Sequence, residues 1–176
     1  MRPLAGTIVG MAIPPVSPAQ GSAIWNWHAE EPLTPSVVMR ALSVVTGCAV
    51  VPLGDDDPPG DAVLCDVWQG VGEFPVGIDC YAPPIEVAEP AAAAEVAALL
   101  RRRVLLADDT LIPDRHVLAT VDGTLRPVHV DVVETDDGEA LSNLRPCTGH
   151  DPWCRQRVPC QQSRWTPDRV VPGLAA

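Results

Sequence analysis

The sequence of 176 residues contains no lysine, so all twelve of its basic residues are arginine. The chain therefore cannot supply the lysine that P-loop enzymes place beside a phosphate, and no glycine-rich phosphate loop is present. The G-x-S-x-G pattern of serine hydrolases is also absent. No apolar run approaches the length that crosses a membrane. These absences exclude P-loop and α/β-hydrolase chemistry and predict a protein that does not enter membranes.

The charge of the chain is strongly acidic and unevenly distributed. Residues 1–144 carry seven arginines against 21 acidic residues, a formal charge of −14, whereas residues 145–176 carry +3. An acidic body argues against nucleic acid as a partner, because phosphate binding needs basic patches. It favours a basic protein partner, although an acidic surface also serves solubility alone. The 20 prolines and the lack of lysine are typical of a GC-rich bacterial genome.

Hydrophobic periodicity predicts an α+β fold, with a mainly antiparallel sheet and two helices on one face in a split β-α-β-like order. Thr34 and Pro35 mark the start of the first helix, and Gly47 marks its end. The alanine-rich second helix is predicted from Ala91 to Arg103, where three arginines would face the negative end of the helix dipole. Strands are expected over residues 22–28, 48–53, 62–69, 73–81 and 104–107.

A β-hairpin is predicted to follow, with strands over residues 115–121 and 124–133. Asp122-Gly123 between them is typical of a two-residue turn, which fixes the register of the two strands. In that register His116 lies directly opposite His129, so the two imidazoles share one face of the hairpin. Residues 136–143 are expected to form a solvated loop or a short helical turn.

His116 and His129, with Asp131 nearby, form one candidate site. Two histidines and a carboxylate could hold a metal ion or carry acid–base chemistry. A pair of solvated or half-buried histidines is the simpler interpretation, because no third firm ligand is evident.

The chain divides into three parts: a loose N-terminal arm over 1–21, an α+β domain over 22–144, and a Cys/His-rich tail over 145–176 packed on that domain. The arm superficially resembles a secretion signal, but it carries one arginine and several glycines and prolines interrupt it. We therefore expect an extended arm and a cytoplasmic protein.

The tail contains the strongest chemical pattern of the sequence, four metal-ligand residues within fourteen positions. Three cysteines and one histidine are a standard ligand set for structural zinc, and the glycine and prolines between them allow a tight backbone knuckle. Disulfide bonds, which would need an oxidising compartment, and free thiols are the alternatives. The predicted zinc ligands are Cys147, His150, Cys154 and Cys160.

The leading functional hypothesis is a non-enzymatic binding protein that engages a basic protein partner, as an inhibitor or a toxin-immunity protein would. Exposed tryptophans and an acidic loop would form the interface. A small metal-dependent enzyme using His116, His129 and Asp131 is one alternative. A zinc-stabilised structural or regulatory module of a larger assembly is another. The predicted contact residues are Trp25, Trp27, Trp68, Asp55, Asp56 and Asp57.

Overall fold

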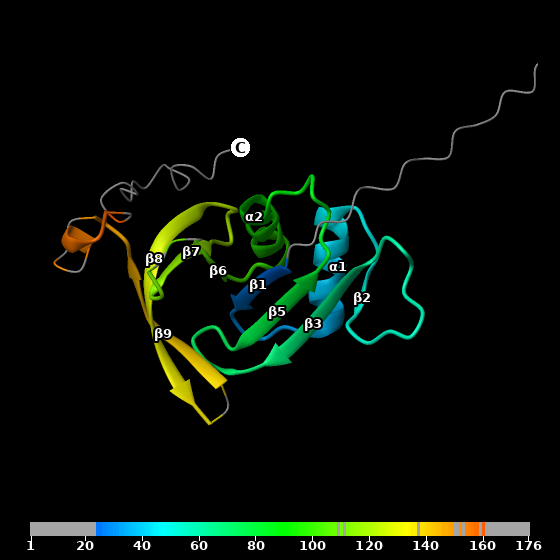
Figure 1. The fold of residues 1–176 in the computed structure, drawn as a ribbon, viewed down its shortest axis with the longest axis horizontal. Helices are drawn as coiled ribbons and strands as arrows, with labels where there is room; N and C mark the ends of the chain where they lie inside the picture. Colours follow the sequence, from blue (N-terminus) through cyan, green and yellow to red (C-terminus); the bar gives the residue numbers. More distant parts are fainter. Residues whose placement is uncertain are drawn as a thin grey trace, which may run out of the picture.

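A computed structural model describes residues 24–108, 110, 112–136, 138–149, 152, 154–158 and 160. Over these residues the chain adopts a mixed α+β fold, with two α-helices and one large sheet of nine strands (Figure 1). The predicted arm over 1–21 and the part of the tail beyond residue 160 lie outside the described residues. Neither α-helix is long and apolar enough to span a membrane.

The elements follow one another in nearly the order that the hydrophobic pattern predicts. The helices are α1 (Pro35–Thr46) and α2 (Glu89–Leu100). The strands are β1 (Ile24–Ala29), β2 (Val50–Pro52), β3 (Val63–Gln69), β4 (Val71–Gly72), β5 (Val76–Tyr81), β6 (Val104–Ala107), β7 (Arg115–Ala119), β8 (Leu125–Thr135) and β9 (Gly138–Pro146).

The ends of α1 are those that its local sequence predicts. Thr34 has the extended backbone of an N-cap residue, and Pro35 occupies the first helical position, where its missing N–H costs nothing. Gly47 ends the helix with a left-handed backbone, φ 69°, and its N–H donates to the carbonyl of Ser43 at 3.0 Å.

The predicted C-terminus of α2 is wrong, because the helix stops at Leu100 and leaves all three arginines outside it. Arg101 takes a left-handed backbone with φ 54°. Beyond it, the Arg103 guanidinium lies 2.7 Å from a carboxylate oxygen of Glu30. The Arg103 backbone N–H donates to the other oxygen at 2.9 Å. This pairing draws the chain away from the helix and into β6.

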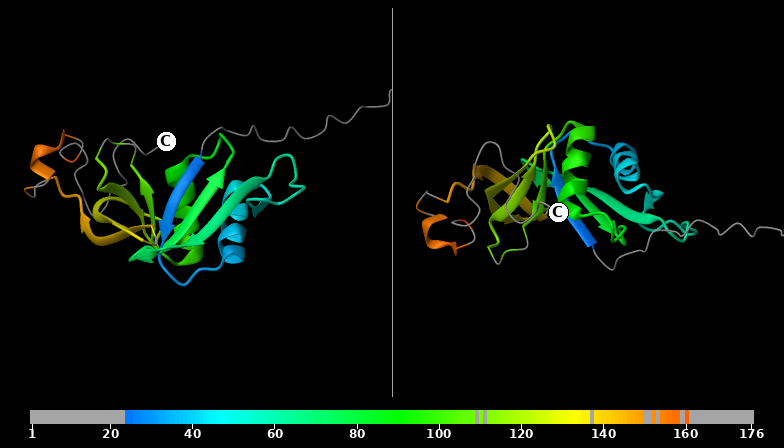
Figure 2. Two further views of the ribbon diagram at one scale, coloured as in Figure 1. Left: turned by 60° about the horizontal axis from the view of Figure 1, so that its bottom comes forward. Right: turned by 90° about the horizontal axis from the view of Figure 1, so that it is seen from above.

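The strand order in the sheet is β2-β3-β5-β1-β6-β7-β8-β9-β4. All neighbouring strands are antiparallel except β2 with β3 and β4 with β9. Both helices lie on one face of the sheet and pack against each other there (Figure 2). The main hydrophobic core fills the space between these helices and the inward-facing residues of the central strands.

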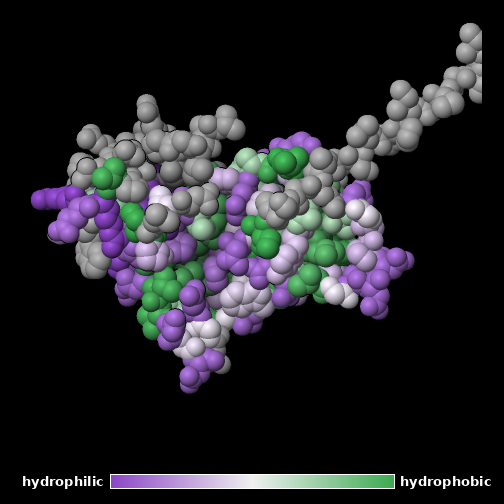
Figure 3. Space-filling view, viewed as in Figure 1, coloured by the Kyte–Doolittle hydropathy of each residue, from purple (hydrophilic) through white to green (hydrophobic). Residues whose placement is uncertain are grey.

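The β8–β9 hairpin bends the sheet back on itself and encloses a second core. β4 follows β3 almost directly in the chain, yet it pairs with β9 at the far edge, so the curled sheet returns toward the β3–β5 connection. Hydrophobic side chains remain exposed on this hairpin (Figure 3), including Val132 and Val133 of β8. The residues of the second core are Phe74, Leu105, Leu118, Val128, Val130 and Leu141.

The expectation of a loop over 136–143 is wrong, since β9 covers most of that range. The strand is polar because it lies at the surface: five of its nine residues are exposed. Its pairing with β8 continues from Thr135 opposite Gly138 to Val128 opposite Pro146, with an irregularity between His129 and Asp131. Surface strands of this kind lack the apolar alternation that makes a strand visible in a sequence.

The β7–β8 hairpin forms where it was predicted, but its register differs by one residue. Thr120 N–H donates to the Thr124 carbonyl at 2.9 Å, and Gly123 N–H donates to the Thr120 carbonyl at 2.9 Å. The loop therefore contains three residues, and Gly123 occupies its left-handed position with φ 78°. His116 accordingly lies opposite Val128, and the predicted pairing of His116 with His129 is wrong.

Candidate metal centre

The register of the β7–β8 hairpin places His129 on the face of the sheet that carries the candidate metal centre. His129 is on β8 and lies opposite Arg115 of β7. The next residue of β7 whose side chain is on the same face is Val117, which belongs to the main core. A shift of one residue in a β-ladder moves every side chain to the other face of the sheet. His116 and His129 therefore lie on opposite faces. His129 is 3% exposed, beyond the part of that face covered by the helices.

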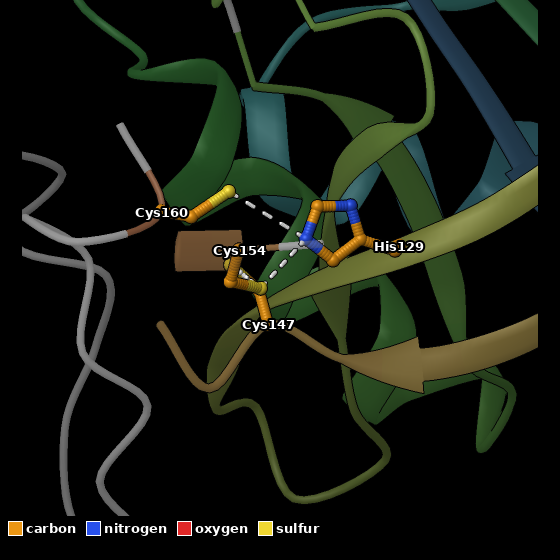
Figure 4. A group of neighbouring side chains, drawn as sticks. All are labelled: His129, Cys147, Cys154 and Cys160. Carbon is orange, nitrogen blue, oxygen red and sulfur yellow. Dashed lines mark hydrogen bonds between the residues drawn. The ribbon is translucent and has the colours of Figure 1, made fainter. Parts of the chain in front are cut away.

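Three cysteines approach the His129 imidazole from the chain that follows β9. Cys147 comes directly after the strand, and its N–H donates to the Pro127 carbonyl at 2.9 Å, which fixes it beside β8. Cys154 begins a short 3-10 helix, Cys154–Gln156, and Cys160 follows it. All three thiols are buried, and their side chains point toward His129 (Figure 4).

The four side chains form a cluster with the dimensions of a metal site. One ligand atom from each residue, three Sγ atoms and an imidazole nitrogen, lies within 4.8 Å of all the others. The Sγ atoms of Cys147 and Cys154 are 3.9 Å apart. His129 Nε2 lies 3.4 Å from Cys154 Sγ and 3.6 Å from Cys160 Sγ. Tetrahedral zinc, with Zn–S near 2.3 Å and Zn–N near 2.0–2.1 Å, requires edges of about 3.8 and 3.6 Å.

The six cysteines among the described residues are free thiols. A disulfide requires a sulfur–sulfur distance of about 2.05 Å. The 3.9 Å separation of Cys147 and Cys154 is far longer, but it matches one edge of a metal tetrahedron. The arrangement is compatible with a bound metal, and it is not that of a disulfide-linked knuckle.

Hydrogen-bond donors around the cluster favour deprotonation of Cys147 in particular. Burial raises the pKa of the Cys147 thiol, but hydrogen bonds from His129 and Arg115 outweigh this effect and lower that pKa to about 7. Burial, followed by repulsion from Cys147, raises the pKa of Cys160. Arg115 is 4% exposed and forms a buried ion pair with Asp108. Its positive charge therefore acts on the thiolates with little screening by water.

Asp114 forms an outer contact of the histidine ligand. Its carboxylate lies 3.5 Å from His129 Nδ1, at the outer limit of a hydrogen bond, and also pairs with Arg157. A carboxylate beside Nδ1 favours the tautomer with the proton on Nδ1, which leaves Nε2 free to bind a metal. Nε2 is the nitrogen that faces Cys154 and Cys160.

Of the four predicted zinc ligands, the structure brings Cys147, Cys154 and Cys160 together, whereas His150 lies outside the described residues. The histidine found in the cluster is His129, which the sequence had suggested for a different site. No spacing rule could have joined it to the cysteines, because it belongs to another strand. The signal was its position on a strand that precedes the cysteines and packs beside them.

The other predicted site residues lie apart from this centre. Asp131 is partly exposed and accepts hydrogen bonds from Asn143 and Arg145, so His116, His129 and Asp131 do not converge.

The expected exposure of the first two tryptophans is wrong. Trp25 and Trp27 stack with ring centroids 5.3 Å apart, and both lie in the main core because they share the helix-covered face of β1. Trp27 also donates to Glu89 at the start of α2, at 2.9 Å. Trp68 is half-buried on the opposite face. Asp55, Asp56 and Asp57 are exposed in the loop between β2 and β3, and their role as partner contacts stays a prediction.

The cluster presents four protein ligands that surround one point. Such a set can hold a metal without leaving a coordination position for water or a substrate, which is the arrangement of structural rather than catalytic sites. Comparison of the chain with protein-family models, with curated proteins and with solved structures found no match in any of the three.

Proposed function

We propose that this chain binds one Zn²⁺ through His129, Cys147, Cys154 and Cys160, and that the ion is structural. The observation that carries the proposal is that all four ligand atoms lie within 4.8 Å of one another, and that the Cys147–Cys154 sulfur separation and two sulfur–nitrogen separations match edges of a zinc tetrahedron. Thiolate and imidazole ligands favour zinc over the hard cations Ca²⁺ and Mg²⁺, which prefer oxygen.

The role of the ion is to fasten the segment from Cys147 to Cys160 to the sheet. Besides the three cysteines, the partly buried Ile112 is the one hydrophobic residue, among those that the structure describes, that packs against this cluster. So small an apolar contact cannot offset the entropy lost when the segment is ordered. Zinc bound by three thiolates and a neutral imidazole has a net charge of −1, and the buried guanidinium of Arg115, which also pairs with Asp108, donates to Cys147 at this site.

The protein as a whole is then a zinc-stabilised binding protein rather than an enzyme, with a basic protein as its partner. The ligand set supports a binding protein rather than an enzyme, because four protein ligands leave no coordination position for water or a substrate. The formal charge of −11 and the exposed acidic loop at Asp55–Asp57 support a basic protein as the partner, since an acidic surface steers a basic partner toward it. An inhibitor or an immunity protein would act in this way.

Two finer assignments belong to the same proposal. The helix α1 connects β1 to the edge strand β2, with β5 and β3 between these strands, and α2 connects β5 to β6 with the antiparallel β1 between them, which supports a split β-α-β arrangement. The free thiols support a reducing compartment, the cytoplasm.

Metal analysis tests the proposal directly. Protein purified without chelator should contain about one zinc per chain. Cys154→Ser should lower the zinc content sharply, because it removes one of four ligands. Cys48→Ser is the matched control, since Cys48 is also buried but lies outside the cluster, and it should retain the zinc. Zinc-free wild-type protein with an ordered 147–160 segment would contradict the proposal.

A further inference from the structure

In the part of the chain that the structure describes, no element covers the face of the sheet opposite the helices over β3, β5 and β1. Side chains alternate along each strand, so the residues next to the core positions point to this face. Asp66, Asp79 and Asn26 lie side by side across the three strands. The next row consists of Trp68, Gly77 and His28. The uncovered face therefore combines carboxylates, an aromatic ring and an imidazole.

The two carboxylates of this face lie directly opposite each other, an arrangement that destabilises a sheet. Asp79 accepts hydrogen bonds from Asn26 and, at 3.0 Å, from the indole N–H of Trp68. Neither Asp66 nor Asp79 forms an ion pair with any residue that the structure describes. A positive group supplied from outside would relieve their repulsion.

Trp68 provides a flat surface next to these carboxylates. Its ring lies across Gly77 so closely that a Cβ atom there would come within 2.0 Å of it. The ring also meets His28 edge-on, with centroids 5.6 Å apart and an interplanar angle of 90°. The side chain is half-buried, so one part of the indole remains accessible. Aromatic faces of this kind attract guanidinium groups.

A cavity of about 200 Å³ adjoins the same face, where the curled β8–β9 hairpin meets the sheet. His28, His116 and Glu139 line it, together with Asn26. Burial, the largest cause, lowers the pKa of both histidines, so both imidazoles are neutral at pH 7. Each neutral ring keeps one nitrogen as a hydrogen-bond acceptor. The cavity therefore offers acceptors, and among the described residues the one charged residue that lines it is an acid.

We propose that the uncovered face over β3, β5 and β1, with its adjoining cavity, binds an arginine side chain of a basic protein partner. The proposal rests on the proposed function, whose partner is basic. A guanidinium carries five N–H donors on a plane, so it can stack on Trp68 while it donates to carboxylates at its edge. A second basic side chain of the same partner can donate to Glu139 and the histidine acceptors in the cavity.

A bare metal ion does not suit this cavity. Among the described residues, the group around His129 is the one set of three or more candidate ligands whose atoms all lie within 4.8 Å of one another. His28, His116 and Glu139 do not form such a set, whereas a planar organic cation can span several ångströms.

The test titrates isotope-labelled, zinc-loaded full chain with a short peptide of alternating arginine and glycine, followed by NMR. Shifts should concentrate on β1, β3, β5 and the rings of His28 and His116. Glu139→Gln should weaken binding by about fivefold, the effect of one favourable ion pair. Glu95→Gln is the charge-matched control, because Glu95 is exposed on α2, on the other side of the sheet, and it should change affinity by less than about twofold. A matched lysine–glycine peptide should bind several-fold more weakly.

Three results would overturn the inference and separate it from the proposed function. If both variants weaken binding equally, or shifts concentrate on residues 54–61, the uncovered face is not the site although a basic partner remains. If Mn²⁺ alone shifts the His28 and His116 signals and displaces the peptide, the cavity is a metal site. If the peptide does not bind at low salt, the basic-partner function fails together with this inference.

Discussion

His129 lies directly opposite Arg115 in the β7–β8 ladder, and His116 lies opposite Val128. This relationship decides the chemistry of the hairpin, because it separates the two histidines onto opposite faces of the sheet. His129 joins the three cysteines of the metal centre, with the charge of Arg115 beside it. His116 instead lines the cavity on the other face with His28 and Glu139. The two histidines therefore have different roles in the proposals above.

The identity of the fourth zinc ligand is the first prediction. His129→Gln should reduce the zinc content of the purified protein well below one per chain, because it removes the imidazole that faces Cys154 and Cys160. His150→Gln is the matched control and should leave the content near one. Metal analysis of the two variants side by side checks this. If the control loses the zinc and His129→Gln keeps it, the ligand set based on His129 is wrong.

Removal of the metal should loosen the segment from Cys147 to Cys160 and lower overall stability. Ligand at 100 times its Kd contributes about 2.7 kcal/mol to stability, so a tightly held zinc should contribute at least about 3 kcal/mol. For a domain of this size, the melting temperature should fall by about 10 °C on treatment with a strong chelator. Calorimetry and hydrogen exchange measure both effects. His129→Gln protein should show little further change on chelation, and an equal change in both proteins would contradict the prediction.

Stability should fall as the pH drops below about 6.5. The pKa values of His28 and His116 are lowered in the folded state, chiefly by burial, so each ring is protonated less readily there than in the unfolded chain. Their contribution to the free energy of unfolding is complete above the pKa of histidine in the unfolded chain, about 6.5. It declines as the pH falls below that value.

Urea unfolding between pH 7.5 and pH 5 checks this, with zinc content measured at each pH so that acid release of the metal is recognised. The double variant with His28→Gln and His116→Gln should depend less on pH. If the free energy of unfolding of that variant depends on pH as strongly as that of the wild type, with zinc retained, other groups are responsible.

Gly123→Ala should destabilise the protein by about 1 kcal/mol, because a left-handed backbone is costly for any residue with a Cβ atom. Gly123 has φ 78°, and an added Cβ would meet only the Ala94 carbonyl oxygen, at 3.8 Å, so the cost comes from the backbone and not from a clash. Gly60→Ala is the control, since nothing lies within 4 Å of an added Cβ there. Chemical denaturation compares the two. Equal stabilities would contradict the three-residue loop.

Association with a basic partner should depend strongly on salt. Raising the ionic strength from about 20 to 150 mM shortens the Debye length from roughly 20 to 8 Å and should slow association about tenfold. Dissociation should change little, because it depends on short-range contacts. Stopped-flow mixing or surface binding with the partner retrieved from the native host measures both rates. An association rate indifferent to salt would argue against the acidic surface as the binding determinant.

Local signals predicted local structure well in this chain. Thr34, Pro35 and Gly47 determine the ends of α1 through their own backbone preferences, so their sequence neighbourhood is sufficient. The short apolar run over 104–107 likewise forms β6 as expected. The end of α2 was missed because Arg103 bonds to Glu30, a residue more than seventy positions earlier in the chain.

The register of the β7–β8 hairpin could not be read from alternation. Leu118 and Val128 are buried on one face, and Val117 and Leu125 on the other, so either register buries apolar side chains. Asp122-Gly123 fits a two-residue turn and a three-residue loop almost equally well. The candidate metal ligands show the same contrast. The spacing of the three cysteines was visible in the sequence, whereas the inclusion of His129 depends on the register of the hairpin, which was not.

The three-residue loop has a consequence for how the protein matures. A chain that folded with the two-residue turn would turn the His129 imidazole to the opposite face and could offer the ion three cysteines and no imidazole. The proposed zinc ion can therefore be bound by all four ligands only in a chain whose β7 and β8 have paired in the native register. Binding of the proposed ion would stabilise that register over the shifted one.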